Sequence, residues 1–177
     1  MPDAARTILS LALVAVLAGC GGAARDVEEQ EAVEASVQEY LRALAQTYST
    51  FDLSHLEGVA SPNEIEAVKL MLKRLSMGGD RLEARLLGTE IDGLEIFRGV
   101  NATVRLTEIW DITRFDAFSG REKGRNPNSV QETLLQLRRV EGRWIVVGRS
   151  VLDRTEPQPT PAVGIAPGDA PKDGAGE

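Results

Sequence analysis

The stretch "ATVRLTEIWDI", residues 102–112, decides the fold because its apolar and polar side chains alternate with a period of two. Such alternation is typical of a β-strand with one buried face and one exposed face. The predicted buried face carries these apolar residues: Ala102, Val104, Leu106, Trp110 and Ile112. Glu108 shares this face, so we expect a carboxylate among apolar side chains in a strand that continues to Phe115.

Strand patterns also occur on both sides of this segment. The other candidate strands are residues 82–88, 89–97, 130–140 and 143–152. Glu141-Gly142 lies between the last two and predicts a tight hairpin. The polar stretch "DAFSGREKGRNPNS", residues 116–129, predicts a turn-rich loop. The segments together predict an antiparallel sheet.

Three helices are predicted before the sheet. The first, within residues 26–49, has a 3-4 spacing of buried positions: Val33, Val37, Tyr40, Leu41, Leu44 and Tyr48. A short apolar set from Phe51 to Val59 predicts a turn or two of helix. Ser61-Pro62-Asn63-Glu64 then predicts a helix start with a capping box, and Gly78-Gly79 predicts its end. The expected fold is α+β, with three N-terminal helices packed on a curved antiparallel sheet over residues 26–154.

The N-terminal segment has the form of a secretory signal, with an apolar run that ends at the only cysteine of the chain. The run is shorter than the roughly 20 residues that a membrane-spanning helix needs. Leu17-Ala18-Gly19-Cys20 resembles the lipobox of bacterial lipoproteins. This resemblance implies a diacylglyceryl group on Cys20, cleavage after residue 19, and a fatty acid such as palmitate on the new N-terminus. The alternative is a buried cysteine in an unprocessed signal.

The same resemblance implies where the protein lies in the cell. Acylation of Cys20 predicts an extracytoplasmic protein anchored to a membrane by lipid, and two or three chains make such anchoring stable. Gly21 follows the cysteine where aspartate is linked to inner-membrane retention, so the outer membrane is expected if the organism has one. Residues 20–25 are expected to be a short tether. Residues 155–177, rich in Pro, Gly and Ala, are expected to be a disordered tail.

Charge restricts the partners. The formal net charge of −7 argues against a nucleic-acid-binding protein, which is usually basic. A basic group surrounds the last predicted hairpin: Arg138, Arg139, Arg143 and Arg149. These arginines are expected to face water, anionic lipid headgroups or an acidic partner surface.

The order and size of the elements resemble the nuclear-transport-factor-2-like superfamily, in which a cone of bent sheet covers a long N-terminal helix. More narrowly, "ATVRLTEIWDI" followed by "ETLLQLRRVEGRWIVV", residues 132–147, resembles the intermembrane-space domain of chloroplast-division proteins and their bacterial relatives. The resemblance implies a pocket between helix and sheet, which holds catalytic side chains in some members. It also implies a homodimer formed through the sheet.

Candidate catalytic residues are few. Glu108 is the best candidate for a general base at a pocket mouth. The alternatives are a buried pair with neighbours on the Arg105 side across the sheet, or a bulge that turns Glu108 into solvent. His55, the only histidine, lies near Asp52 and Ser54, where a proton-transfer pair competes with a helix cap.

The aromatic residues Tyr40, Tyr48 and Trp110 are candidates to line a ligand pocket, although filling the core is the simpler role for each. No phosphate-binding loop is present, and one histidine with one acylated cysteine makes a metal site or cofactor unexpected. The favoured function is a lipid-anchored binding or scaffolding module of the cell envelope without catalysis, which holds an envelope protein or a small apolar ligand. The alternative is a small-molecule isomerase or hydrolase of the same fold.

Overall fold

The computed structural model describes residues 21–155. The predicted signal peptide, the predicted lipid attachment at Cys20 and the predicted tail after residue 155 lie outside the described residues. The elements in chain order are α1 (Gly21–Thr50), a 3-10 turn η1 (Leu53–Leu56), α2 (Pro62–Met77), β1 (Asp80–Phe97), β2 (Asn101–Asp116), β3 (Glu122–Val140) and β4 (Arg143–Thr155). The expected α+β class is confirmed.

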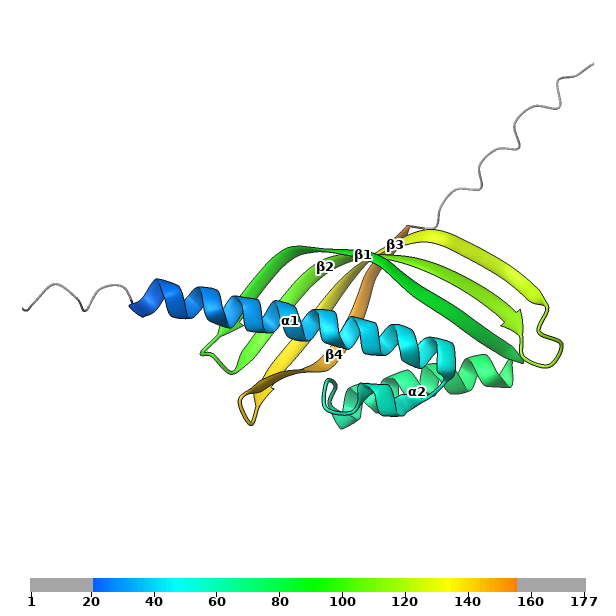
Figure 1. The fold of residues 1–177 in the computed structure, drawn as a ribbon, viewed down its shortest axis with the longest axis horizontal. Helices are drawn as coiled ribbons and strands as arrows, with labels where there is room; N and C mark the ends of the chain where they lie inside the picture. Colours follow the sequence, from blue (N-terminus) through cyan, green and yellow to red (C-terminus); the bar gives the residue numbers. More distant parts are fainter. Residues whose placement is uncertain (1–20, 156–177) are drawn as a thin grey trace, which may run out of the picture.

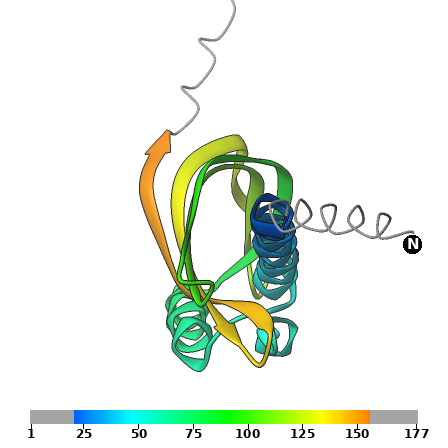
Figure 2. The same cartoon turned by 90° about the vertical axis from the view of Figure 1, so that its left-hand side faces the viewer.

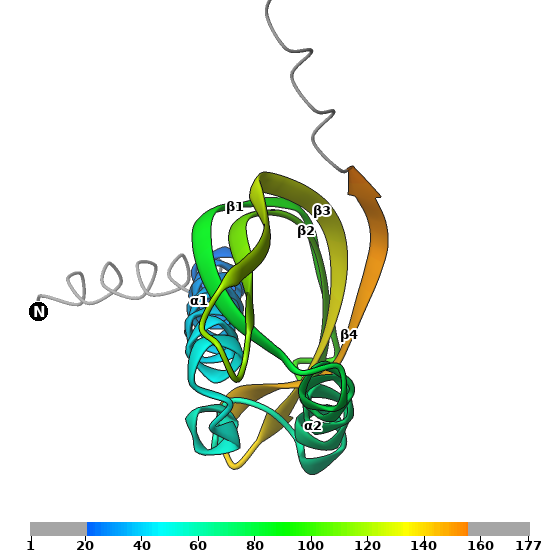
Figure 3. The ribbon, with the colours of Figure 1, turned by 90° about the vertical axis from the view of Figure 1, so that its right-hand side faces the viewer.

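The sheet is a four-stranded antiparallel meander in the order β1-β2-β3-β4, and it arches over α1 (Figures 1 and 3). The two strands predicted for residues 82–97 are one strand, β1. Register shifts against β2 between Leu86 and Gly88 and between Ile91 and Gly93 interrupt its pairing. Such bulges bend a strand without ending it, so the apparent break in the sequence pattern marks a bend.

The loop predicted for residues 116–129 is shorter than expected. Strand β3 begins at Glu122. Its residues Arg125 and Asn126 pair with Thr113 and Ile112 of β2. Pro127 and Asn128 fall in a register shift, where Asn128 takes a positive φ of 53°. The irregular residues are thus absorbed in a bulge of a long strand.

Within the described residues, two α-helices, and not three, precede the sheet. Helix α1 ends before Phe51, which has a φ of 60°, and the segment that was expected to form a middle helix makes only the single turn η1. The chain then extends, and Ala60 forms a parallel bridge with Val146 of β4. Pairing with the sheet edge therefore replaces further helix. At the other end, residues 21–25 belong to α1, where an extended tether was expected.

Helix α2 begins as predicted, but with half of the capping box. The Ser61 hydroxyl accepts a hydrogen bond from the Glu64 backbone N–H at 3.3 Å. The Ser61 backbone N–H donates to the carbonyl of Val146, and the Glu64 side chain turns into the interior. The start of α2 is thus attached to the sheet.

The core lies between the concave face of the sheet and the two helices. The largest fully buried side chains include those predicted on α1 and β2: Val33, Val37, Tyr40, Leu41, Leu44, Val104, Leu106 and Trp110. Strands β3 and β4 add Leu135, Leu137, Trp144 and Val146. One polar cluster interrupts this apolar interior.

Candidate functional site

The candidate site is the group of polar side chains that the fold buries inside the cone. Glu108 lies on the core face of β2 with Leu106 and Trp110, as the alternation predicted, and its side chain is fully buried. Its direct partner on β3 is Gln131, which is also buried. Glu108 is therefore not turned into solvent by a bulge.

One oxygen of Glu108 accepts three hydrogen bonds. The donors to Oε2 are Trp110 Nε1, Gln131 Nε2 and Arg149 Nη2, each at 2.6 Å. The contact with Arg149 is an ion pair in which the arginine side chain is 12% exposed. Glu108 is thus paired across the sheet with Arg149 of β4. It is not paired with neighbours of Arg105, and the Arg105 side chain itself is exposed.

A bulge explains why Arg149 faces inward. The β3–β4 register shifts between Gln136 and Leu137, so that Val146 opposes Leu137 and Arg149 opposes the buried Leu135. Simple alternation from Val146 would turn Arg149 outward. Burial alone would lower the pKa of the Arg149 guanidinium, but the charge and hydrogen bond of Glu108 together with the nearby Tyr48 and Tyr40 outweigh burial, and the pKa is raised. The expectation that Arg149 faces water or headgroups is wrong.

A second buried pair lies beside the first. The Tyr40 hydroxyl on α1 donates to Glu64 Oε1 on α2 at 2.6 Å. Burial, reinforced by the charge of Glu64, raises the pKa of Tyr40, so this phenol stays protonated. Tyr48 contacts the Trp110 ring with a centroid distance of 6.2 Å. The four residues predicted to line a pocket are thus all next to the core between α1 and the sheet.

The chemistry open to this interior cluster is limited by access. A general base must reach the proton of a substrate, and Glu108 is enclosed with one oxygen already accepting three donors. Its other oxygen, Oε1, is buried without a hydrogen bond, as are the hydroxyls of Thr47 and Thr133. The cluster therefore joins α1, β2, β3 and β4 rather than presenting a reactive group to solvent.

Asp52 and His55 are not brought into this cluster. The Asp52 carboxylate caps η1 by accepting from the Ser54 backbone N–H at 2.9 Å. This hydrogen bond lowers the pKa of Asp52. Among residues 21–155 no hydrogen bond joins Asp52 to His55, and Asp52 takes the role of a helix cap.

An open groove lies where the C-terminal part of α1 meets the sheet. It has a volume of about 580 Å³. Its lining is mostly polar: Ser49, Glu83, Ala84, Arg85, Asp111, Thr113, Phe115, Glu122 and Arg125. Asp111 is almost buried and accepts from Arg125 at 2.8 Å and from Arg85 at 3.1 Å. Sequence reasoning missed this group because the β2–β3 register shift next to Asp111 has no clear signal in the pattern.

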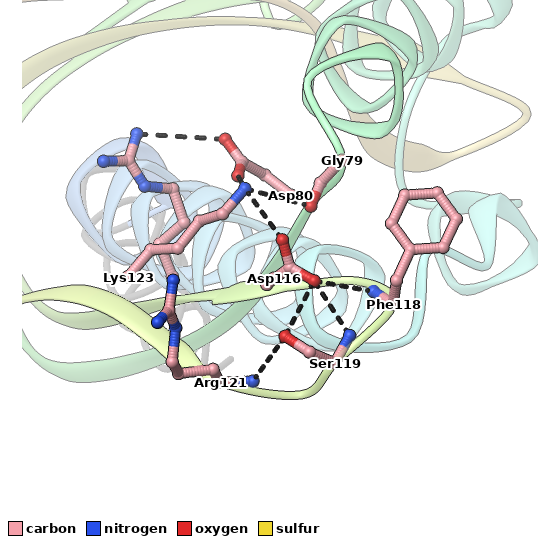
Figure 4. Close-up of polar contacts among 8 residues, drawn as sticks. Gly79, Asp80, Asp116, Phe118, Ser119, Arg121 and Lys123 are labelled. Atoms are coloured by element: carbon pink, nitrogen blue, oxygen red, sulfur yellow. Dashed lines mark hydrogen bonds and ion pairs between the residues drawn. The ribbon is translucent and has the colours of Figure 1, made fainter.

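The β2–β3 turn is held by Asp116 (Figure 4). Asp116 Oδ1 accepts from the backbone N–H groups of Phe118 and Ser119 at 3.1 and 2.8 Å. Lys123 lies 3.4 Å from the other oxygen and 2.7 Å from Asp80. The hydrogen bonds from Ser119, with smaller effects of Phe118 and Lys123, lower the pKa of Asp116 to about 2.

Replacing Asp116 with Asn should therefore reduce stability in a pH-dependent way. A carboxyl group with a folded pKa of about 2 stabilises the fold above its unfolded pKa, about 4, and this contribution is lost as the pH falls through 2. The difference in melting temperature between wild type and Asp116→Asn should be greatest above pH 5 and shrink towards pH 2. A difference that is constant from pH 6 to pH 2 would contradict this role.

Within the described residues, no group of three or more His, Cys, Asp or Glu side chains is placed to hold a metal ion. In the same part of the chain, none of the helices is both long and apolar enough to span a bilayer.

Comparison with known proteins relates this chain to others by fold. No family model matches the sequence, and a search of curated proteins found no match. The intermembrane-space region of chloroplast protein ARC6 is similar with a TM-score of 0.55 and 14% identity, over 67% of this chain and 92% of that chain. A structure from Catenulispora acidiphila has a TM-score of 0.50 and 15% identity, over 72% and 94%.

A nuclear-transport-factor-2-like superfamily protein from Salmonella enterica serovar Typhimurium also matches, with a TM-score of 0.47 and 12% identity, over 82% of this chain and 99% of that chain. At these identities the similarity concerns the fold alone. The resemblance to the intermembrane-space domain that the sequence suggested is confirmed at that level, and it assigns no function.

Proposed function

We propose that this chain is a lipid-anchored binding or scaffolding module of the cell envelope that performs no catalysis. The observation that carries the proposal is the state of Glu108, the best candidate base in the sequence. It is fully buried and paired with Arg149, and so acts as a structural group. The lipobox sequence that ends at Cys20 supports the anchor.

The groove between α1 and the sheet is the surface we propose for the partner. Its volume of about 580 Å³ is in the range of ligand sites. Charged side chains, including Arg85 and Arg125, line it, and they suit an envelope protein with polar groups better than a small apolar ligand. Pairing of two copies through the sheet stays a prediction.

The alternative is a small-molecule isomerase or hydrolase. One observation favours it: Glu108 Oε1 and the hydroxyls of Thr47 and Thr133 are buried without hydrogen bonds, as groups that contact a polar ligand would be. The enzyme would need an opening of the cone that brings substrate to Glu108. Glu108→Gln would then abolish turnover, whereas the scaffold hypothesis expects partner binding to survive this change if the domain stays folded.

Replacing Cys20 with Ala tests the anchor. Wild type should sediment with membranes and be extracted only by detergent, because acyl chains hold it there. The Cys20→Ala variant should lose membrane association. Mass spectrometry of the N-terminal peptide should show a lipid-modified Cys20 as the first residue. An unmodified, uncleaved N-terminus on a chain that still sediments would contradict the anchor.

A further inference from the structure

We propose that one end of the domain rests on the surface of a lipid bilayer. This surface, called the hairpin end, consists of the β1–β2 turn, residues 97–101, and the β3–β4 turn, residues 138–143. The proposal rests on the proposed function in one respect, which is that Cys20 carries the lipid anchor. It adds which part of the folded domain contacts the membrane.

The hairpin end is fastened to the beginning of α1. Glu29 Oε1 accepts a hydrogen bond from Arg139 Nη1 at 2.9 Å, and a side chain added at Gly99 would meet the same carboxylate at 3.2 Å. The two turns are themselves joined, because the Arg139 backbone N–H donates to the carbonyl of Val100 at 2.8 Å. Figure 2 views the molecule from this end, so that the first turns of α1 and the two hairpins face the viewer.

The distance from the anchor is short. Helix α1 begins at Gly21, directly after Cys20, and Glu29 is nine residues beyond the cysteine. At 1.5 Å per helical residue, the level of Glu29 lies about 14 Å along the axis from the lipid attachment. A domain whose first helix starts at the membrane therefore holds the hairpin end close to the headgroup layer, which the turns reach when α1 tilts toward the bilayer.

The side chains of the hairpin end suit that layer. Phe97, Val100 and Val140 are 49%, 48% and 42% exposed and gather three large apolar side chains on adjoining turns. The exposed basic residues among them are Arg98, Arg138 and Arg143, and in the described part of the chain none of these three forms an ion pair. Apolar side chains flanked by arginine are typical of surfaces that enter the bilayer interface, where guanidinium groups contact phosphates.

The turns are held in shape before they meet a membrane. Glu141 and Gly142 both have positive φ, 50° and 84°, as in the type I′ turns of tight hairpins. Arg98 and Gly99 also have positive φ, 54° and 64°. The apolar residues beside these turns are therefore presented without further ordering of the backbone.

Charge decides which side of this end approaches the lipid. The exposed side chains of Asp26, Glu28 and Glu31 make the first turns of α1 acidic, and anionic headgroups repel them. The hairpin turns carry three unpaired arginines against Glu141. The turns, and not the flank of α1, should therefore contact the bilayer. The β2–β3 turn with Phe118, which is 92% exposed, lies at the opposite end of the long axis (Figure 1).

The test uses the full chain with its native lipid, produced in a bacterial host and reconstituted in vesicles of phosphatidylethanolamine and phosphatidylglycerol. Val100→Cys and Val140→Cys each introduce one thiol for an environment-sensitive fluorophore, and Phe118→Cys is the matched control on the opposite turn. The wild-type chain should take up no dye, because its only cysteine is acylated. With nitroxide-labelled headgroups, quenching at positions 100 and 140 should exceed that at 118 by at least threefold.

Any other result of these labelling experiments contradicts either the proposed orientation or the lipid anchor. If the protein binds vesicles but quenching at positions 100 and 140 is absent or equal to that at 118, the proposed orientation is wrong, whereas the anchor stands. A protein partner then becomes the expected occupant of the hairpin end. Stronger quenching at 118 also overturns the orientation. Dye on the wild-type Cys20, or wild type that does not bind vesicles, overturns the anchor and this proposal with it.

Discussion

Arg149→Met should lower the free energy of unfolding by about 3–5 kcal/mol, because it leaves the Glu108 carboxylate buried without its counter-charge. Glu108 would keep the donors Trp110 Nε1 and Gln131 Nε2, but no cation. Met approximates the length of the arginine stem, so most of the loss comes from the uncompensated charge and not from a cavity. Urea denaturation followed by far-ultraviolet circular dichroism measures it.

Two controls separate the buried pair from ion pairs in general. Lys69→Met breaks an exposed pair with Glu66 on α2 and should cost at most about 1 kcal/mol. The double variant Glu108→Leu with Arg149→Met removes both charges and should recover most of the lost stability, since apolar groups of similar volume replace a buried pair at little cost. A loss below about 1 kcal/mol for Arg149→Met alone would mean that Glu108 has access to water.

That result would also bear on the choice between scaffold and enzyme. A carboxylate that must stay charged and paired for the domain to fold is a poor candidate for taking protons from a substrate. A carboxylate that tolerates loss of Arg149 would be open to solvent in some conformation, as the enzyme hypothesis requires. The stability of one variant thus separates the two hypotheses before any substrate is known.

The sequence predicts those parts of this molecule that follow a regular period. The core face of β2, the buried face of α1 and the hairpin at Glu141-Gly142 were all predicted, because alternation and 3-4 spacing report directly on burial. Glu108 was placed on the core face for the same reason. The α+β class follows from the order of these elements.

Bulges account for most of what the sequence did not predict. A single extra residue reverses the two faces of a strand from that point on. The shift beside Val146 turns Arg149 inward, so the partner of Glu108 was not foreseen, and the shifts in β1 made one strand resemble two. The middle segment was counted as a third helix but forms only the 3-10 turn η1, because the chain directly after it pairs with β4 through Ala60, a contact that no local pattern shows.

Trp110→Ala should reduce the free energy of unfolding by about 3–5 kcal/mol, because it removes the largest fully buried side chain and leaves a cavity. It also removes the Nε1 donor to Glu108 and the ring contact with Tyr48. The measurement is again urea denaturation by circular dichroism. Phe118→Ala, at an exposed aromatic residue of the β2–β3 turn, should change stability by no more than about 0.5 kcal/mol.

Trp110→Phe divides the two roles of this indole. The phenyl ring fills most of the volume but donates no hydrogen bond, so the expected loss of about 1–3 kcal/mol reports mainly on the lost donor to a buried carboxylate. Combining Trp110→Phe with Glu108→Leu removes the acceptor as well, and the two losses should then be clearly less than additive. Additive losses would mean that the indole and the carboxylate act independently. The 2.6 Å contact between them would then contribute nothing to the cluster that joins α1 to the sheet.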